Sequence, residues 1–170
     1  MRVELTAVLS LGSNLGDREA TIRAAVRDIG ALAGVVVTAA SGLVETPALG
    51  PEGVDADAPA YLNAVVAVRS ALDSSALLSA LAGIEHAHGR VRDIRWGDRT
   101  LDIDIISYAG QRSHTPTLTL PHPRAAERAF VLAPWLQIEP DATLPGFGRV
   151  DELLAATGEL PTQYPAEPLL

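Results

Sequence analysis

The sequence predicts a single α/β (α+β) domain, a ferredoxin-like βαββαβ sandwich in which helices cover a mainly antiparallel sheet, followed by a C-terminal extension. Its 170 residues fit one domain, and they contain no internal repeat and no interdomain linker. Strand-like and helix-like segments also follow one another in the split order that defines this sandwich. We expect the domain to span residues 1–157 and the proline-rich residues 158–170 to form a loose tail.

The first half of the chain predicts a strand, a helix and a second strand. Residues 5–11 are a short apolar run that ends in a glycine-containing turn at residues 12–14. Asp17 then has the position of a helix N-cap, and Gly34 ends the helix. A valine-rich segment from 35 to about 44 follows as the second strand. The apolar residues at helical spacing between the two strands are Ile22, Val26, Ile29 and Leu32.

The second half predicts a strand, a helix and a final strand. Residues 46–59 form a long loop, and residues 61–68 form the third strand. Asp73 caps a second helix. An arginine-rich loop at 89–100 then leads into a fourth strand at 101–108, which completes the βαββαβ order. The residues on one face of the second helix are Leu77, Leu81, Ile84 and His88.

Beyond this unit the sequence indicates only short elements. Residues 117–120 and 130–132 are expected to be short extended pieces. Residues 150–156 are expected to form one or two helical turns. These pieces make up the C-terminal extension that precedes the tail.

Composition excludes several classes of site and partner. There is no cysteine, so disulfides, zinc–thiolate sites and thiol nucleophiles are excluded. The net charge of −8 argues against a nucleic-acid partner, because binding a polyanion requires an excess of cations. The first residues lack the apolar core of a signal peptide, and no window is long and apolar enough to cross a membrane. We therefore expect a cytoplasmic protein with no membrane partner.

Arginine is the only basic residue type other than histidine in this chain. All 13 Lys and Arg positions are arginine, so the lysine that a Walker-type phosphate loop requires is missing. Any phosphate must therefore be bound by arginines, backbone amides or metal ions. Seven of the 13 arginines lie between Arg90 and Arg128. Clustering alone is equally typical of a chain that uses arginine on every solvated surface.

Asp102 and Asp104 form the most informative pair in the chain. Side chains alternate along a strand, so both carboxylates lie on one face, opposite Leu101, Ile103 and Ile105. Residues two apart on a strand are separated by roughly 6.5–7 Å, which lets both carboxylates converge on one hard cation or on a pair of them. Mg²⁺ is the expected cation, because it binds to one or two carboxylates together with substrate phosphates. The alternative is an amphipathic strand with a solvated acidic face.

A cationic loop stands directly before this acid pair. It carries four arginines in ten residues, Arg90, Arg92, Arg95 and Arg99, in a loop that contains Gly89 and Gly97. ATP with bound Mg²⁺ requires arginines for its phosphate oxygens and carboxylates for its metal. This segment brings both kinds of side chain close together. Surface ion pairs between the two sets are the alternative, which the position of the arginines in a loop disfavours.

Two further groups of residues suit ligand binding. His122 lies between two prolines and cannot belong to a helix interior, and Arg124 and Arg128 follow it. Tyr61 and Asn63 share one face of the third strand, and an asparagine can bond the edge of a flat heterocycle. The four histidines show no metal-ligand spacing. Those without a functional context are His86, His88 and His114.

Five motifs occur in the order of one enzyme family. They are GSNLGD at 12–17, ETPALGP at 45–51, YLNAVV at 61–66, GRVRDIRWGDRTLDIDII at 89–106 and LPHPR at 120–124. Together they resemble the 6-hydroxymethyl-7,8-dihydropterin pyrophosphokinase family of folate biosynthesis, over nearly the whole chain up to about residue 157. The block at 89–106 is highly specific. The resemblance implies transfer of the terminal pyrophosphoryl group of ATP to the hydroxymethyl group of the pterin, with release of AMP.

The resemblance also implies roles for individual residues. Asp102 and Asp104 would bind two Mg²⁺ ions on the triphosphate, and Asp104 is the candidate for accepting the proton of the attacking hydroxyl. The implied catalytic arginines are Arg90, Arg92 and Arg99. The residues implied at the ATP site are Glu85, Arg90, Arg92, Arg95, Trp96, Arg99, Ile105, His122 and Arg128. Those implied at the pterin site are Thr46, Pro47, Leu49, Tyr61, Asn63, Trp96 and Phe130, with Phe130 stacked on the ring.

The chain departs from the family pattern in ways that remove no residue required for the chemistry. Asp98 stands where a proline is frequent, Pro123 where some members have an aromatic residue, and the loop at 50–61 is long and acidic. Two other functions stay open on the residues alone. A non-catalytic nucleotide- or RNA-binding module is disfavoured by the 4% aromatic content and the negative charge. A phosphohydrolase would release ADP or phosphate instead of AMP. We expect a monomer.

Overall fold

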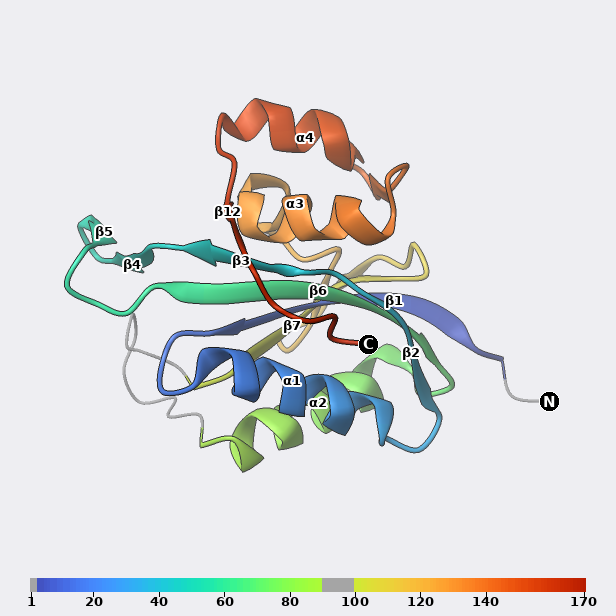
Figure 1. Cartoon of the computed structure of the whole chain (residues 1–170). Helices are drawn as coiled ribbons and strands as arrows, with labels where there is room; N and C mark the ends of the chain where they lie inside the picture. The colour runs from blue at the N-terminus through green and yellow to red at the C-terminus, as the bar shows by residue number, and fades with distance from the viewer. Residues whose placement is uncertain (1–2, 90–99) are drawn as a thin grey trace.

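The computed structural model describes residues 3–89 and 100–170, which form helices on both faces of one antiparallel sheet (Figure 1). The helices are α1 (Arg18–Gly30), α2 (Ser74–Ala87), the 3-10 turn η1 (Ala125–Glu127), α3 (Ala129–Ile138) and α4 (Val150–Thr157). The main-sheet strands are β1 (Leu5–Ser13), β2 (Val35–Ala40), β3 (Leu43–Thr46), β6 (Tyr61–Ser70), β7 (Asp102–Tyr108) and β12 (Thr162–Tyr164). The short strands are β4 (Ala48–Gly50), β5 (Gly53–Asp55), β8 (Ser113–His114), β9 (Thr119–Leu120), β10 (Thr143–Leu144) and β11 (Gly148–Arg149).

The main sheet confirms the predicted fold class. Its order is β12-β3-β6-β1-β7, and β2 also pairs with β6. The first strand, β1, lies between β6 and β7 and is antiparallel to both. The chain order β1-α1-β2-β6-α2-β7 is therefore the predicted βαββαβ arrangement. Three two-stranded sheets, β4-β5, β8-β9 and β10-β11, are added to this frame.

Helices α1 and α2 cover one face of the sheet and bury the first hydrophobic core (Figure 1). Each begins as predicted, because the Asp17 carboxylate accepts a hydrogen bond from the Ala20 N–H and Asp73 accepts one from Ala76. Their buried residues include the predicted ones, Ile22, Val26, Ile29, Leu77, Leu81 and Ile84. Burial of these apolar stripes, more than local propensity, stabilises the two helices.

Helices α3 and α4 lie on the opposite face and bury a second core (Figure 1). Strand β7 contributes to both cores, and its register with β1 shifts once. Leu9 pairs with Ile105 while Val8 pairs with Ser107, so Ile106 is an extra residue, as in a β-bulge. Ile105 packs in the first core and Ile106 in the second.

The second strand differs from the prediction, because it is divided in two. One strand was expected over residues 35–44, whereas the structure has β2 and β3 with Ser41 and Gly42 between them. The Ser41 hydroxyl accepts a hydrogen bond from the Val65 N–H at 2.9 Å, in place of a backbone carbonyl. The Gly42 N–H donates to the Gln137 side chain of α3 at 2.8 Å. Side chains therefore complete the hydrogen bonding where the ladder is interrupted.

The prediction for residues 130–132 was wrong, because they belong to helix α3. Among the described residues no side chain caps this helix, and Pro134 lies within it, so its local sequence carries weak helix signals. Burial explains the helix instead, since Trp135 is 2% exposed and packs in the second core. The helical turns expected at 150–156 are confirmed as α4.

The expectation of a loose tail at 158–170 is contradicted by the contacts of these residues. Strand β12 pairs with β3, placing Thr162 opposite Glu45 and Tyr164 opposite Leu43. Leu169 packs against the first core. The prolines that suggested a loose segment flank a short edge strand, a position that proline tolerates. Among the helices of the described residues, none has the length and apolar character needed to cross a membrane.

Candidate active site

Asp102 and Asp104 lie on the edge strand β7 with the orientation that the sequence predicts. Both side chains are half-buried, while Leu101, Ile103 and Ile105, which alternate with them, are buried. The strand is fixed from α2, where the buried Glu85 carboxylate accepts a hydrogen bond from the Ile103 N–H at 3.0 Å. Glu85 was predicted at the ATP site, and in the structure its described bond holds the strand that carries the two aspartates.

His122 and Arg128 bring two nitrogen donors to Asp104. His122 Nε2 and Arg128 Nη1 each lie 3.9 Å from Asp104 Oδ2. The His122 N–H also donates to the Ile106 carbonyl at 2.9 Å, which fastens this segment to β7. His122 and Arg128 therefore both lie beside the Asp104 carboxylate, although Arg128 is 24 residues further along the chain. Both residues were predicted at the ATP site, and the structure brings them together.

The electrostatics of this group favour a neutral histidine. Burial, together with the Arg128 charge, lowers the pKa of His122 from 6.5 to about 4. His122 Nδ1 accepts a hydrogen bond from the Arg124 N–H at 3.2 Å, which places the ring proton on Nε2, on the Asp104 side. The pKa of Arg128 is lowered from its ordinary value, mainly by burial, and the neighbouring Asp104 offsets part of this shift. The site thus presents a neutral N–H donor and a cation beside the carboxylate.

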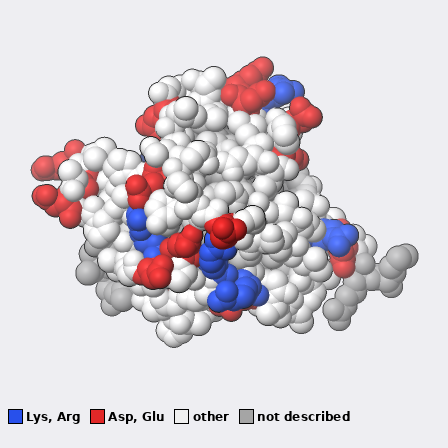
Figure 2. Space-filling model, viewed as in Figure 1, with Lys and Arg blue, Asp and Glu red and all other residues white. Residues whose placement is uncertain are grey.

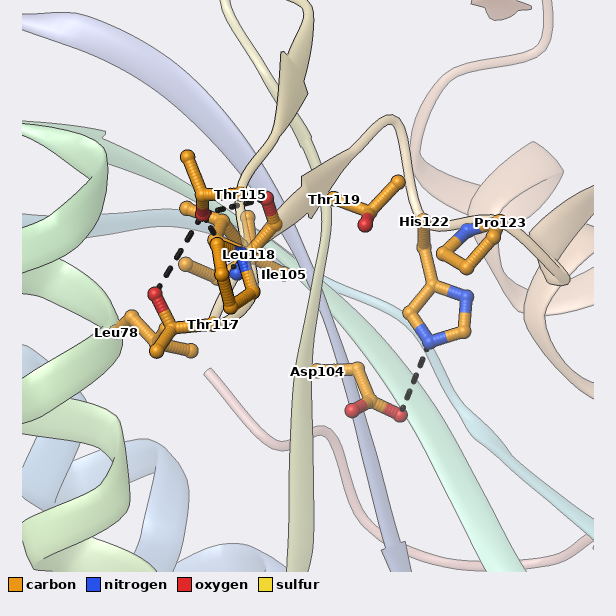
Figure 3. Close-up of a pocket in the computed structure, with 10 residues that line it drawn as sticks. Leu78, Asp104, Ile105, Thr115, Thr117, Leu118, Thr119, His122 and Pro123 are labelled. Atoms are coloured by element: carbon orange, nitrogen blue, oxygen red, sulfur yellow. Dashed lines mark hydrogen bonds and ion pairs between the residues drawn. The ribbon is translucent and has the colours of Figure 1, made fainter.

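A pocket of about 230 Å³ opens next to Asp104 (Figure 3). Leu78, Ile105 and Leu118 give it apolar walls, and threonines supply hydroxyl groups. Its lining residues are Leu78, Asp104, Ile105, Thr115, Pro116, Thr117, Leu118, Thr119, His122 and Pro123. In the close-up the Asp104 carboxylate points toward the His122 ring, and Leu78 and Ile105 lie on the other side (Figure 3). Of the predicted ATP-site residues, Ile105 and His122 line this pocket, whereas its threonines were missed.

The predicted pterin residues gather where β3 and β6 meet. Thr46 pairs with Tyr61, and Asn63 Nδ2 donates to Thr46 Oγ1 at 3.0 Å. Asn63 is 4% exposed, so its side-chain amide is largely shielded from solvent. Phe130 lies in the first turn of helix α3, which packs on β6 and β3, and the Arg128 guanidinium is 5.6 Å from the centre of its ring.

The remaining predicted pterin residues lie next to this group. Pro47 follows β3 directly and is exposed. Leu49 lies in β4 of the β4-β5 hairpin. Acidic side chains gather around this hairpin, where Glu52, Asp55 and Asp57 are exposed (Figure 2).

Gly12 lies in the sheet between the predicted pterin residue Asn63 and the predicted metal ligand Asp102. In the sheet it pairs with Asn63 on one side and with Asp102 on the other, so these three residues form one row on one face. A Cβ atom at Gly12 would lie 2.8 Å from Asn63 Oδ1, closer than packing allows. Gly12 was predicted to lie in a turn, and its place in this row was not predicted. A glycine at the end of an apolar strand is the signal that indicates a close approach.

Arg90, Arg92, Arg95, Trp96 and Arg99 lie outside the described residues. Within residues 3–89 and 100–170, no group of three or more His, Cys, Asp and Glu could hold a metal ion. Two half-buried carboxylates on one strand face nevertheless fit Mg²⁺, which takes one or two carboxylates and fills its other positions with water and phosphate oxygens.

Comparisons with known proteins agree on one family. Residues 8–140 match the family described as 7,8-dihydro-6-hydroxymethylpterin-pyrophosphokinase. A Methylorubrum extorquens relative, named 2-amino-4-hydroxy-6-hydroxymethyldihydropteridine pyrophosphokinase, is 43% identical over 140 residues, which cover 82% of this chain and 86% of the relative. A Mycobacterium leprae protein of the same name is 44% identical over 163 residues, covering 87% and 81% of the two chains.

Solved structures support the fold. The crystal structure of Plasmodium falciparum HPPK-DHPS wild type with pteroate has a TM-score of 0.70 and 14% identity, over 92% of this chain and 43% of that chain. A further crystal structure of HPPK-DHPS in complex with substrates has a TM-score of 0.67 and 13% identity. This chain spans 43% of each of those two chains, and the likeness concerns the architecture alone.

Proposed function

This chain belongs to the 7,8-dihydro-6-hydroxymethylpterin-pyrophosphokinase family, and from that premise we propose that it transfers pyrophosphate from ATP to 6-hydroxymethyl-7,8-dihydropterin in folate biosynthesis. The products are AMP and the pterin diphosphate. The observation that carries the proposal is the row Asn63-Gly12-Asp102, because it sets a heterocycle-binding amide beside a metal-binding carboxylate. ATP is the co-substrate and Mg²⁺ the cofactor, with two ions expected.

Asp102 and Asp104 are the residues that would hold Mg²⁺ in this proposal. Bound Mg²⁺ would neutralise charge on the phosphate oxygens and orient the phosphate chain. Arg128 adds a fixed positive charge next to Asp104. His122, neutral at pH 7, offers its Nε2–H as a hydrogen-bond donor without adding a charge. From the family resemblance, Arg90, Arg92 and Arg99 would contact the phosphates.

The pocket next to Asp104 is the proposed site of the nucleotide base. Its walls, Leu78 and Ile105, suit the faces of a flat ring, and the hydroxyls of Thr115, Thr117 and Thr119 suit its polar edge. Asp104 belongs to the lining, so a nucleotide held in this pocket has its phosphates next to the acid pair. Binding the base thus positions the reacting phosphorus.

The proposed pterin position lies across Gly12 from the acid pair. Asn63 would bond the pterin edge, and Phe130 would stack on the ring face. The hydroxymethyl oxygen then attacks the β-phosphorus of ATP. The bond between this phosphorus and the oxygen bridging to the α-phosphate breaks, and AMP leaves with that oxygen. The hydroxyl proton passes to a carboxylate, for which Asp104 is the candidate.

A product assay tests this proposal. The chain is incubated with ATP, Mg²⁺ and 6-hydroxymethyl-7,8-dihydropterin, and nucleotide products are separated by chromatography. We expect AMP in an amount equal to the pterin diphosphate, and none without pterin or with excess chelator. Release of ADP, or turnover indifferent to pterin, would instead identify a phosphohydrolase that uses the same acid pair.

We further propose that the enzyme acts as a cytoplasmic monomer. The contacts of Asp104 with Arg128 and of Asn63 with Thr46 form within a single chain, which supports a site built by one copy. Light scattering coupled to gel filtration tests this, with a mass near 17.8 kDa expected. A stable dimer at assay concentrations would contradict it.

A further inference from the structure

We propose that Arg18, supported by the C-terminal strand β12, is a positioning residue for the pterin site; this inference rests on the proposed function. Arg18 begins helix α1, directly after the GSNLGD segment. Its Nη1 donates to Glu45 Oε2 and to the Ala60 carbonyl oxygen, both at 2.8 Å. Glu45 precedes Thr46, and Ala60 precedes Tyr61. One guanidinium therefore joins the two chain segments that lead into the pterin residues.

The joined segments form only a short stretch of sheet. Strand β3 pairs with β6 through three residue pairs, the last being Thr46 with Tyr61. The Thr46–Asn63 hydrogen bond of 3.0 Å depends on that register. A short ladder at the end of a strand frays easily, because few hydrogen bonds hold it. The contacts of Arg18 fall at this end, so they fix the spacing between the two pterin-site strands.

A second contact from the same segment acts in the same direction. Asn14, which is 2% exposed, donates from Nδ2 to the Pro59 carbonyl at 3.3 Å. Residues 14 and 18 thus hold two consecutive carbonyls immediately before β6. This observation separates the role of Arg18 from that of an ordinary surface ion pair, because its partners include backbone next to the site.

Strand β12 limits how far Arg18 can move. The Arg18 guanidinium lies 5.6 Å from the centre of the Tyr164 ring, and Thr162 pairs with Glu45, the other partner of Arg18. The Arg18 side chain is 22% exposed, so solvent screens its contacts only in part. The family match ends at residue 140, and β12 lies beyond it. The C-terminal segment therefore adds a contact that this match does not include.

The test compares Arg18→Ala with Arg23→Ala, a matched arginine on the same helix. Arg23 bonds the Glu167 and Pro168 carbonyls and has no bond to Glu45 or Ala60 among the described contacts. We expect Arg18→Ala to raise KM for the pterin roughly tenfold, with KM for ATP and kcat changed by less than about twofold. Arg23→Ala should leave all three near wild type. Arg18→Lys should restore pterin affinity in part, because lysine keeps the positive charge but lacks the planar guanidinium group.

The outcomes separate this inference from the proposed function. If the wild-type chain shows no pterin-dependent AMP formation, the proposed function is wrong. If the wild type is active, an unchanged pterin KM in Arg18→Ala overturns the inference, as does an equal loss in every parameter. If Arg18→Ala does not fold, Tyr164→Leu in the full chain replaces it, because this change keeps apolar packing and removes only the ring. A pterin KM raised about threefold then supports the inference, and no change overturns it.

Discussion

The proposed nucleotide half and the proposed pterin half of the site are built in different ways. Asp104, His122 and Arg128 come from one edge strand and the segment that follows it. Thr46, Asn63 and Gly12 come from three different strands, and Phe130 comes from a helix on the sheet face. The first half depends on neighbours along the chain, whereas the second depends on the register of a whole sheet.

This difference determines what a substitution should change. In the proposed nucleotide half the carboxylates of Asp102 and Asp104 can be removed without disturbing the fold, because they lie on the face opposite Ile103 and Ile105. In the pterin half a change of one small residue shifts others, because the strands are packed side by side. Substitutions in the two halves should therefore differ in what they change: turnover, the affinity for one ligand, or stability.

Asp102→Ala should abolish most turnover while the fold survives. The carboxylate is half-buried on the site face, and the core residues alternate with it on the other face. We expect kcat to fall by about a thousandfold, with an unchanged melting temperature. Steady-state AMP formation and thermal unfolding measure the two quantities. Asp141→Ala is the control, because the side chain of Asp141 is 94% exposed. A folded Asp102→Ala protein with most of its activity would remove this residue from the metal site.

Gly12→Ala should damage the pterin half selectively. The added Cβ would lie 2.8 Å from Asn63 Oδ1, and the Asn63–Thr46 bond limits how far that amide can retreat. We expect kcat/KM for the pterin to fall by up to about a hundredfold, with nucleotide affinity nearly unchanged. Pterin and nucleotide titrations followed by fluorescence measure this. Gly83→Ala on α2 is the matched control, since a Cβ there meets no atom within 4 Å. Equal losses for both ligands would show that the halves are not separable.

Glu85→Ala should reduce stability more than it reduces binding of either ligand. Its carboxylate is 4% exposed and accepts the Ile103 N–H, so truncation leaves a buried donor without that acceptor. We expect the free energy of unfolding to fall by about 1–3 kcal/mol, measured by urea denaturation. Glu85→Gln keeps an accepting oxygen and should lose less. Wild-type stability in the alanine variant would mean that this bond does not support β7.

His122 should make stability depend on pH in a defined window. The folded-state pKa of about 4 lies below the ordinary 6.5, so between these values the unfolded chain binds a proton that the folded chain excludes. The free energy of unfolding therefore falls as pH is lowered from 6.5 toward 4. In chelator-containing buffer, His122→Gln should show a shallower fall than wild type over this range. Parallel curves would show that this imidazole is not shielded.

The nucleotide half was largely predictable from the sequence. The two-residue spacing of Asp102 and Asp104 on an apolar strand determines that they share a face, and the structure confirms this. His122 and Arg128 were predicted at the ATP site from the family resemblance, and both meet Asp104. The threonines of the pocket were not predicted, because a threonine-rich loop has no periodicity that indicates which hydroxyls face inward.

The parts that escaped prediction depend on contacts between distant segments. The helix at Phe130 forms because Trp135 is buried in the second core, although Pro134 opposes helix formation locally. Strand β12 forms because the edge of β3 accepts it, a fact that the sequence of the tail does not contain. Gly12 has no side chain to suggest a function, and its role follows only from what lies beside it.

The extra residue at Ile106 separates two alternation patterns within one strand. Ahead of it, the odd-numbered residues 103 and 105 pack under α1 and α2, whereas beyond it the even-numbered Tyr108 does so. If one residue were deleted here, Asp104 and Tyr108 could no longer both keep their faces, since side chains change sides at every step. Either the tyrosine would leave its core or the carboxylates would turn toward the helices. Evolution can therefore vary the chemistry of residues 102–108 more freely than their number.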